Sequence, residues 1–418
     1  MSAHVHPIRP VAAFSPLCYD LPHCDRLKKG LPIVTESRIA RLDQKLSALR
    51  RALETRQERI LEEALTIQAI PAPTFDESRR AAYIRQRLGG IAGLDSIHVD
   101  DLHNVYARLA GRDRQAAGIL VSAHTDTVFD LATPLTARRE GRHIYAPGLG
   151  DNSLGVAALI ATADLLADHL LPCDVWFVAN SREEGLGDLG GIRAVTDYLK
   201  GRIGTAIVLE GMALGRIYHA GIAVRRLKIH CKGQGGHSWL HFGRESAIHG
   251  LLRLGAGIAA LRVPEHPRTT YNIGVIEGGS TVNTIAADAS LLLDLRSEST
   301  EALARLEKAV QMLIDQNRTP DLTYDVTLVG DRPAGAIPRA HPLPQLAGEV
   351  LQHLGIRPLY ETGSTDANML LHKGIPTVTL GITQGGNAHR LDEYIEIEGM
   401  LSGMWQLVLI IAGAAEYL

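Results

Sequence analysis

Hydrophobic positions near the start of the chain recur at the intervals of an amphipathic helix. The residues that form the first such run are Ile39, Leu42, Leu46, Leu49 and Leu53. A second run, through Ile60, Leu61 and Leu65, stops before Pro71 and predicts another helix. Residues 1–35 contain prolines and histidines without any period, so we expect them to form an N-terminal extension outside the folded domains.

The following part of the chain alternates buried strands with a helix. Continuous apolar runs predict strands at 118–123, 175–179 and 206–209, and residues 155–170 have the composition of a buried helix. This alternation is typical of a parallel α/β sheet with helices on both faces. Charged residues follow directly where the strands end, which is where open α/β sheets place their sites.

The middle of the chain predicts a self-contained β-α-β-β-α-β unit inserted into the first domain. Its expected strands are 224–231, 271–276, 286–296 and 322–328, and its expected helices are 246–261 and 300–316. After residue 330 the α/β character returns, with a strand at 377–381 and a closing apolar helix. We therefore predict a catalytic domain with a mixed, mainly parallel sheet from residues 36–221 and 330–418, and an inserted domain at 222–329.

Composition narrows the class of protein and its partners. A chain of 418 residues exceeds the size at which one core keeps growing, which favours two domains. The net charge of −3 gives no reason to expect a nucleic-acid partner. Four scattered cysteines fit a reducing cytoplasm. The first residues show no export signal, and the most apolar segment, 407–415, is shorter than the roughly 20 residues of a bilayer span, so we expect no membrane partner.

A histidine and two aspartates follow the first buried strand. His124 comes directly after it, and Asp126 lies two positions on, where a carboxylate can accept the second ring N–H of a metal-bound histidine. Asp151 lies in the glycine-flanked loop 148–151, where a bridging carboxylate has room to approach two ions. The alternative for Asp151 is an N-cap of the helix that begins near Gly155.

Three glutamates and a second histidine lie at later positions of the same kind. Glu183 and Glu184 follow the 175–179 strand, where adjacent like charges are costly unless cations balance them. A metal site explains the pair, because one carboxylate ligates while the other takes the proton of a water. A solvated acidic loop is the alternative. Glu210 ends the next strand, and His389 follows the strand at 377–381.

The histidines and carboxylates form one mixed nitrogen and oxygen donor set. Its members are His124, Asp151, Glu184, Glu210 and His389. This mixture suits zinc or manganese and supports paired ions about 3.5–4 Å apart. We therefore expect two divalent metal ions per subunit, with zinc as the first choice and cobalt or manganese as alternatives.

In order and context these segments resemble the co-catalytic zinc peptidases that include aminoacylase, carboxypeptidase G, acetylornithine deacetylase, succinyl-diaminopimelate desuccinylase and peptidase T. The likeness runs from about Leu61 to the C-terminus. It implies that His124, Asp151 and Glu210 bind one ion. It implies that Asp151, Glu184 and His389 bind the other, that Asp126 orients His124, and that Glu183 is the general base. It also implies a cis peptide bond between Asp151 and Asn152.

The resemblance extends into the inserted unit. His237, in the segment Gly-Gly-His-Ser-Trp, looks like the family's histidine that helps polarise the scissile carbonyl, often from the neighbouring subunit. Asn283 and Arg296 look like its substrate-binding residues, and arginine is a natural bidentate partner of a carboxylate. A turn histidine and a sheet-edge ion pair are the alternatives. Uncovered sheet edges and the apolar helix at 246–261 favour a homodimer joined through this lid/dimerisation domain, with a monomer and a simple lid as the alternative.

The resemblance implies an enzyme that hydrolyses the amide bond of an N-acyl amino acid or of a small peptide with a free carboxylate. Deacylases and carboxypeptidases of the family usually have glutamate at the position of Glu210, whereas its aminopeptidases have aspartate. A di- or tripeptide aminopeptidase of the peptidase T kind is the alternative. A hypothesis of another class is a non-catalytic binding module with the same fold. Such relatives lose ligands or the base, and this chain has them all.

Overall fold

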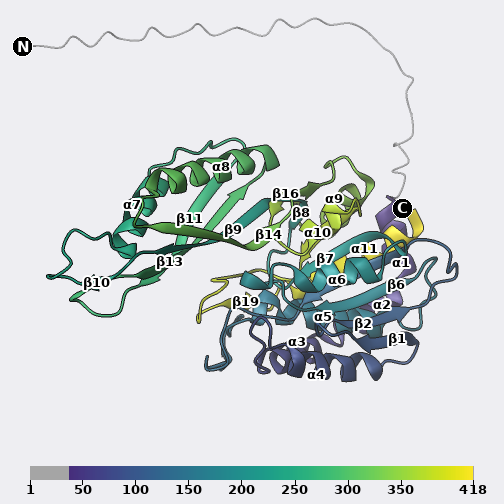
Figure 1. Cartoon of the computed structure of the whole chain (residues 1–418). Helices are drawn as coiled ribbons and strands as arrows, with labels where there is room; N and C mark the ends of the chain where they lie inside the picture. Colours follow the sequence, from purple (N-terminus) through teal and green to yellow (C-terminus); the bar gives the residue numbers. More distant parts are fainter. Residues whose placement is uncertain (1–36, 418) are drawn as a thin grey trace, which may run out of the picture. The chain divides into compact units, whose positions relative to one another are not determined.

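The structure is a computed structural model, and it describes residues 37–417 (Figure 1). The extension expected at residues 1–35 lies outside the described residues.

Within residues 37–417, nine strands form the larger sheet, in the order β1-β2-β6-β3-β7-β17-β8-β15 with β16 paired to β8. Their bounds are β1 (Leu94–Val99), β2 (Val105–Leu109), β3 (Gly118–His124), β6 (Val175–Asn180), β7 (Ile203–Glu210), β8 (Arg216–Gly221), β15 (Gly335–Ala336), β16 (Leu359–Gly363) and β17 (Thr377–Gly381). The central strands β6, β3, β7 and β17 pair in parallel, and both flanks contain antiparallel pairs. The predicted mixed α/β sheet is confirmed.

Helices cover both faces of this sheet, as the alternation of its side chains requires. Val121 and Phe177 belong to one buried cluster, whereas their neighbours Leu120 and Trp176 belong to another on the opposite face. The first face carries α1 (Arg38–Lys45), α2 (Ser47–Glu54), α3 (Gln57–Gln68), α4 (Ser78–Gly89), α5 (Leu154–Leu166), α9 (Pro342–His353) and α11 (Met400–Tyr417). The second carries α6 (Gly190–Tyr198) and α10 (Ala367–His372).

Two details of these helices differ from a simple pattern. The helix expected to run through Leu53 is divided into α1 and α2, because the backbone at Leu46 (φ −96°, ψ 10°) leaves the helical region. In the described part of the chain, the segments 149–166 and 400–417 are long and apolar enough to cross a membrane. They are 83% and 72% buried inside the protein, so here they act as core helices.

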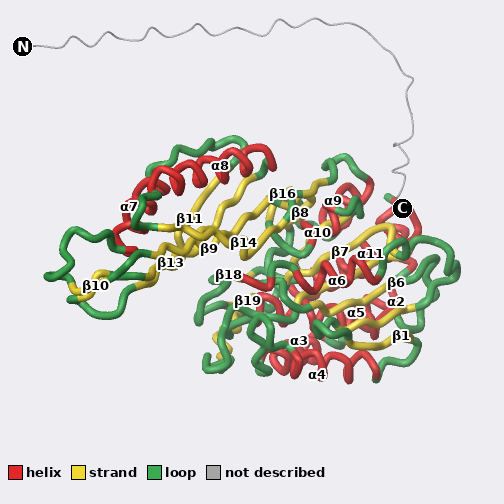
Figure 2. The backbone as a smooth tube through the Cα atoms, viewed as in Figure 1, coloured by secondary structure: helices red, strands yellow, loops and turns green. Residues whose placement is uncertain are grey.

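A second sheet has four antiparallel strands in the order β11-β13-β9-β14 within the described residues. These are β9 (Ala223–Lys232), β11 (Thr269–Gly278), β13 (Asp288–Ser297) and β14 (Thr323–Arg332). Two helices, α7 (Ala247–Ala259) and α8 (Thr300–Asn317), pack on one face of it (Figure 2) and share a buried cluster with its strands. The predicted β-α-β-β-α-β order is therefore present.

Short strands, which have no period to detect in the sequence, form two further small sheets. One pairs β10 (Gly236–His237) with β12 (Thr284–Ile285). The other joins β18 (Gly385–Gly386), β19 (Tyr394–Glu396), β5 (His143–Tyr145) and β4 (Arg138–Glu140). This second sheet ties the chain near Asp151 to the chain near His389, although they are far apart in sequence.

Candidate metal centre

The larger sheet brings the candidate donors together at the carboxyl ends of its central strands. His124 is the last residue of β3 and Glu210 the last residue of β7. Glu183 and Glu184 follow β6, which pairs in parallel with β3 so that His124 lies beside Asn180. Parallel neighbours end at the same edge, and the site therefore forms there.

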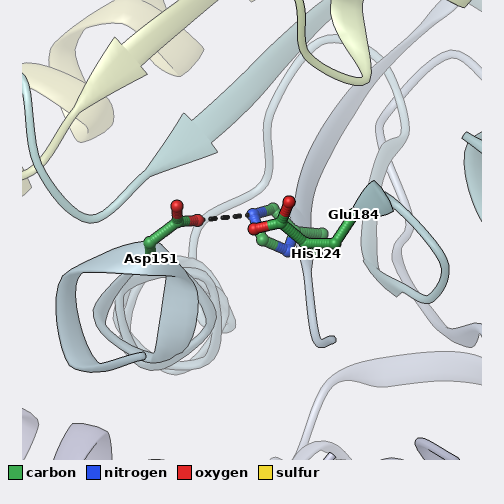
Figure 3. Close-up of side chains that lie close together, drawn as sticks. All are labelled: His124, Asp151 and Glu184. Carbon is green, nitrogen blue, oxygen red and sulfur yellow. Dashed lines mark hydrogen bonds and ion pairs between the residues drawn. The ribbon is translucent and has the colours of Figure 1, made fainter. Parts of the chain in front are cut away.

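Asp151 lies between two histidines. Its Oδ1 is 3.1 Å from Nε2 of His124, and its Oδ2 is 3.2 Å from Nε2 of His389. Figure 3 shows the Asp151 carboxylate directed at the His124 ring, with Glu184 beside it. The N-cap alternative for Asp151 is not observed, since Ser153 takes the N-cap position of α5. The Asp151–Asn152 peptide bond is cis, as predicted.

Two glutamates complete the two halves of this cluster. Oε2 of Glu210 is 3.7 Å from Nε2 of His124, and Oε1 of Glu184 is 3.1 Å from Nε2 of His389. Donor atoms of His124, Asp151 and Glu184 all lie within 4.8 Å of one another. Two ligands of a tetrahedral zinc ion, with bonds of about 2.0–2.2 Å, lie about 3.3–3.6 Å apart. The separations and the donor types therefore fit a pair of divalent ions that share Asp151.

The acid–base behaviour of the cluster shows a need for positive charge. Burial raises the pKa of Glu184 and of Glu210 to about 7. Hydrogen bonds with Asp151 and Glu184 raise the pKa of His389 to about 10. Burial opposes ionisation of Asp151, yet hydrogen bonds from His124 and His389 lower the pKa of its carboxyl group. Bound divalent cations would supply this positive charge, which supports the fit of these residues to metal.

Asp126 is fully buried beneath the cluster and organises the loop that carries the glutamates. Its carboxylate accepts the backbone N–H groups of Glu183 at 2.9 Å and Glu184 at 3.0 Å, and the hydroxyl of Thr74 at 2.8 Å. Its Oδ1 is 3.6 Å from Nδ1 of His124, and its backbone oxygen is 3.1 Å from the same nitrogen. Asp126 thus contacts both His124 and the glutamate loop.

Glu393 holds the Asp151 loop in the way that Asp126 holds the glutamate loop, and it was not predicted as a site residue. Its buried carboxylate accepts backbone N–H groups from Gly148, Gly150 and Asp151, at 3.3, 2.7 and 3.0 Å. Burial raises the pKa of this group to about 7. Its place four positions after His389 was visible, but its burial comes from the small sheet around β19, which the sequence pattern does not show.

Two further buried groups lie near the glutamates. Nη1 of Arg332 donates to Oε1 of Glu183 at 2.8 Å. Asp366 is fully buried, accepts a hydrogen bond from Asn180 at 2.7 Å, and has a pKa raised well above its usual range by burial. The available signal was their position, at the end of β14 for Arg332 and in the segment Gly-Ser-Thr-Asp-Ala-Asn, 363–368, for Asp366.

The predicted substrate-binding residues divide into two groups. Arg296 lines the cavity of about 390 Å³ that contains Asp151, and it pairs with Asp294 at 2.6 Å, which is the ion pair considered as its alternative. His237 and Asn283 are exposed and adjacent, since Ser238 donates to the backbone oxygen of Asn283 at 3.0 Å. Within the described residues, neither is among those that line this cavity.

Comparisons with known proteins found a matching family, related sequences and similar folds. The family described as Peptidase family M20/M25/M40 matches residues 120–412. The chain is 25% identical to a succinyl-diaminopimelate desuccinylase of Corynebacterium glutamicum over 338 residues, which is 79% of this chain and 89% of that protein. It is 28% identical to an acetylornithine deacetylase of Klebsiella pneumoniae over 320 residues, which is 71% of this chain and 80% of that protein. The fold is similar to a tripeptidase structure from Staphylococcus aureus, with a TM-score of 0.71 and 21% identity, covering 86% of this chain and 99% of that one.

Proposed function

The chain belongs to peptidase family M20/M25/M40 and is a hydrolase of that family, and from this premise we propose that it cleaves the amide bond of an N-acyl amino acid or of a small peptide with a free carboxylate. The observation that carries the proposal is the position of Asp151, whose two oxygens lie 3.1 and 3.2 Å from two different histidines. A carboxylate in this position suits a shared ligand of two divalent ions.

In this proposal one ion is held by His124, Asp151 and Glu210, and the other by Asp151, Glu184 and His389. Zinc is the first choice, and cobalt and manganese are the alternatives. When bound, such ions would lower the pKa of a coordinated water to about 7 and would polarise a carbonyl group.

The protein's own groups then handle the protons. Glu183 takes a proton from the attacking water and returns it to the leaving nitrogen, which is the ordinary cycle of a general base. Asp126 keeps Glu183 and Glu184 in place through their backbone N–H groups. We assign to His237 the donation of a hydrogen bond to the carbonyl oxygen as it gains negative charge.

The substrate class follows from the charges around the cavity. Arg226 and Arg296 line it together with the candidate donors, and arginine side chains suit the recognition of a carboxylate. Two relatives, a desuccinylase and a deacetylase, are named for removing acyl groups. Glutamate at position 210 favours the same class, as the family resemblance implies. The likeness to the tripeptidase concerns the fold and adds no weight to an aminopeptidase.

We further propose that the inserted domain, residues 222–329, joins two subunits, and that His237 and Asn283 serve the partner's site. Their exposure and their absence from the described lining of the Asp151 cavity support this assignment. A cytoplasmic homodimer is the assembly that we propose.

The experiment is a hydrolysis screen with metal analysis. The purified chain is stripped with a chelator, and its activity is measured on N-acetyl and N-succinyl amino acids and on unblocked tripeptides, with zinc, cobalt or manganese restored. We expect about two ions per chain and cleavage of the acylated substrates. Hydrolysis of tripeptides alone would contradict the deacylase proposal and favour the aminopeptidase alternative. Activity without any bound metal would contradict both proposals.

A further inference from the structure

Arg332 lies where the two sheets of the protein meet along the chain. It is the last residue of β14, and its backbone pairs with Val224 at the start of β9. These two strands are the ones by which the chain enters and leaves the four-stranded sheet. The Arg332 side chain is only 5% exposed, and a buried guanidinium needs partners for its charge.

Glu183 provides two hydrogen-bond acceptors for the Arg332 guanidinium, one on its side-chain carboxylate and one on its backbone. Nη1 of Arg332 donates to the Oε1 atom of Glu183 at 2.8 Å, and Nη2 donates to the backbone oxygen of the same residue. Nη1 also lies 3.3 Å from the hydroxyl of Ser364. Within residues 37–417 the guanidinium engages one of the two oxygens of the Glu183 carboxylate, and the other oxygen remains available as the proton acceptor.

Further bonds fasten the glutamate loop to the same strand ends. Both carboxylate oxygens of Asp188 accept the backbone N–H of Asp331, at 2.9 and 3.0 Å. Arg193 donates to the backbone oxygen of Asp331, and Arg226 donates to that of Gly185. Because Arg332 follows Asp331 directly, the bonds to Asp331 hold the backbone of Arg332 near the glutamate loop. The bonds of the guanidinium hold its side chain against Glu183.

We propose that Arg332 is a positioning residue for the general base: its guanidinium holds the Glu183 carboxylate in the orientation in which the free oxygen faces the attacking water. This inference rests on the proposed function, since it takes Glu183 as the base. A glutamate side chain without such a partner samples several rotamers, and a misplacement of about 1 Å at a reacting group costs about a hundredfold in rate. Charge-assisted hydrogen bonds from a guanidinium fork are well suited to restrict it.

The test compares Arg332→Lys and Arg332→Ala with the same substitutions at Arg225. Arg225 is a matched control, because it adjoins the same strand ends and pairs with Asp331 at 3.2 Å but, within the described residues, forms no hydrogen bond or ion pair with Glu183. We expect both Arg332 variants to lose about tenfold to a hundredfold in kcat with KM within about twofold. Bound metal, measured by elemental analysis, and the Kd of a product carboxylate, measured by calorimetry, stay at wild-type values. Added guanidinium at low millimolar concentration restores activity to Arg332→Ala and not to Arg225→Ala.

A double variant separates this inference from the function on which it rests. If Arg332 acts through Glu183, the pair Glu183→Gln with Arg332→Lys is no slower than Glu183→Gln alone, because residues that act as a unit are not additive. Full independent effects of the two substitutions overturn the inference, as does a raised KM with unchanged kcat, which assigns Arg332 to substrate binding. If Arg332→Ala does not fold, an unimpaired Arg332→Lys still overturns it. An active Glu183→Gln enzyme defeats the proposed base, whatever the Arg332 variants do.

Discussion

The candidate metal centre and the outer end of the four-stranded sheet differ in how their side chains are surrounded. At the centre, Asp126 and Glu393 are fully buried and each accepts backbone N–H groups from a loop that carries candidate ligands. At the outer end, Trp239 and Phe242 are 84% and 92% exposed, in the same loop as His237. Large exposed apolar groups at one place mark an interaction surface.

The two halves of the proposed site obtain their fixed geometry from different sources. Buried carboxylates hold the ligand loops in a fixed geometry within one chain, so metal binding needs little rearrangement. His237 has no comparable support, since its Nδ1 accepts hydrogen bonds only from the backbone of its own turn among the described residues, at 3.2 and 3.5 Å. We therefore expect the first half to work in every folded chain and the second half to work in the assembly.

Asp151→Asn should have the largest effect, because an amide offers one good donor oxygen where the centre needs two. We expect bound metal to fall to at most one ion per chain and activity to fall by about 10⁴-fold or more, since metal stabilisation of the transition state is worth several kcal/mol. Elemental analysis and kcat/KM measure the two effects. Asp325→Asn, at an exposed position, is the control. Two ions retained by Asp151→Asn would exclude the shared-ligand geometry.

Glu183→Gln comes next and tests the chemistry without removing a proposed ligand. We expect kcat to fall by about 10² to 10⁴, the usual contribution of a general base, while metal content stays near wild type. The same substitution at exposed Glu398 is the control. Loss of metal in Glu183→Gln would show that Glu183 is a ligand, and the roles of the adjacent glutamates would have to be exchanged.

His237→Ala tests the half of the site that we assign to the assembly. We expect a loss of about 10² to 10³ in kcat, as for removal of one donor to a developing oxyanion. Mixing this variant with Glu183→Gln under conditions of subunit exchange should restore activity, because a mixed dimer contains one intact site. If mixed dimers form and stay inactive, His237 does not act across subunits.

Glu393→Gln should have a smaller effect, confined to metal affinity. The amide can still accept hydrogen bonds from Gly150 and Asp151 through one oxygen, but the charge that holds their loop is lost. Groups that orient metal ligands typically contribute 10-fold to 100-fold in affinity, so we expect a change of about that size in the Kd for zinc, measured by competition with a chelator. An unchanged Kd would make Glu393 a group that serves folding alone.

Phe242→Ser should have the smallest effect on the free energy of unfolding of a subunit, below about 0.5 kcal/mol, because the side chain is already exposed. Leu251→Ala, in the buried cluster of the same sheet, should cost about 2–5 kcal/mol in the same denaturant titration. Sedimentation velocity should show weaker dimerisation for Phe242→Ser. A large loss of stability from Phe242→Ser would mean that this loop is packed within its own subunit.

Periodic elements and strand-end residues were predictable from the sequence. The strand predicted at 377–381 has the observed bounds of β17, and the donors named from sequence lie together at one end of the sheet. Their roles as ligands stay predictions. Glu393 and Arg332 were not predictable as site residues, because their importance comes from contacts with Gly150 and Glu183, 243 and 149 residues away. Hydrophobic periodicity describes neighbours along the chain, and short strands such as β19 have too few residues to show a period.

The pairing of β17 with β7 has a consequence for the order of events during synthesis. The two strands pair residues such as Ala206 and Thr377, which are 171 positions apart, whereas the four-stranded sheet is built from one continuous stretch, 223–332. A nascent chain emerging from the ribosome can complete the inserted sheet while the larger sheet still lacks β17 and α11. His389 lies within that late segment. We therefore expect the candidate metal centre to be among the last parts assembled, after the proposed subunit contact surface has folded.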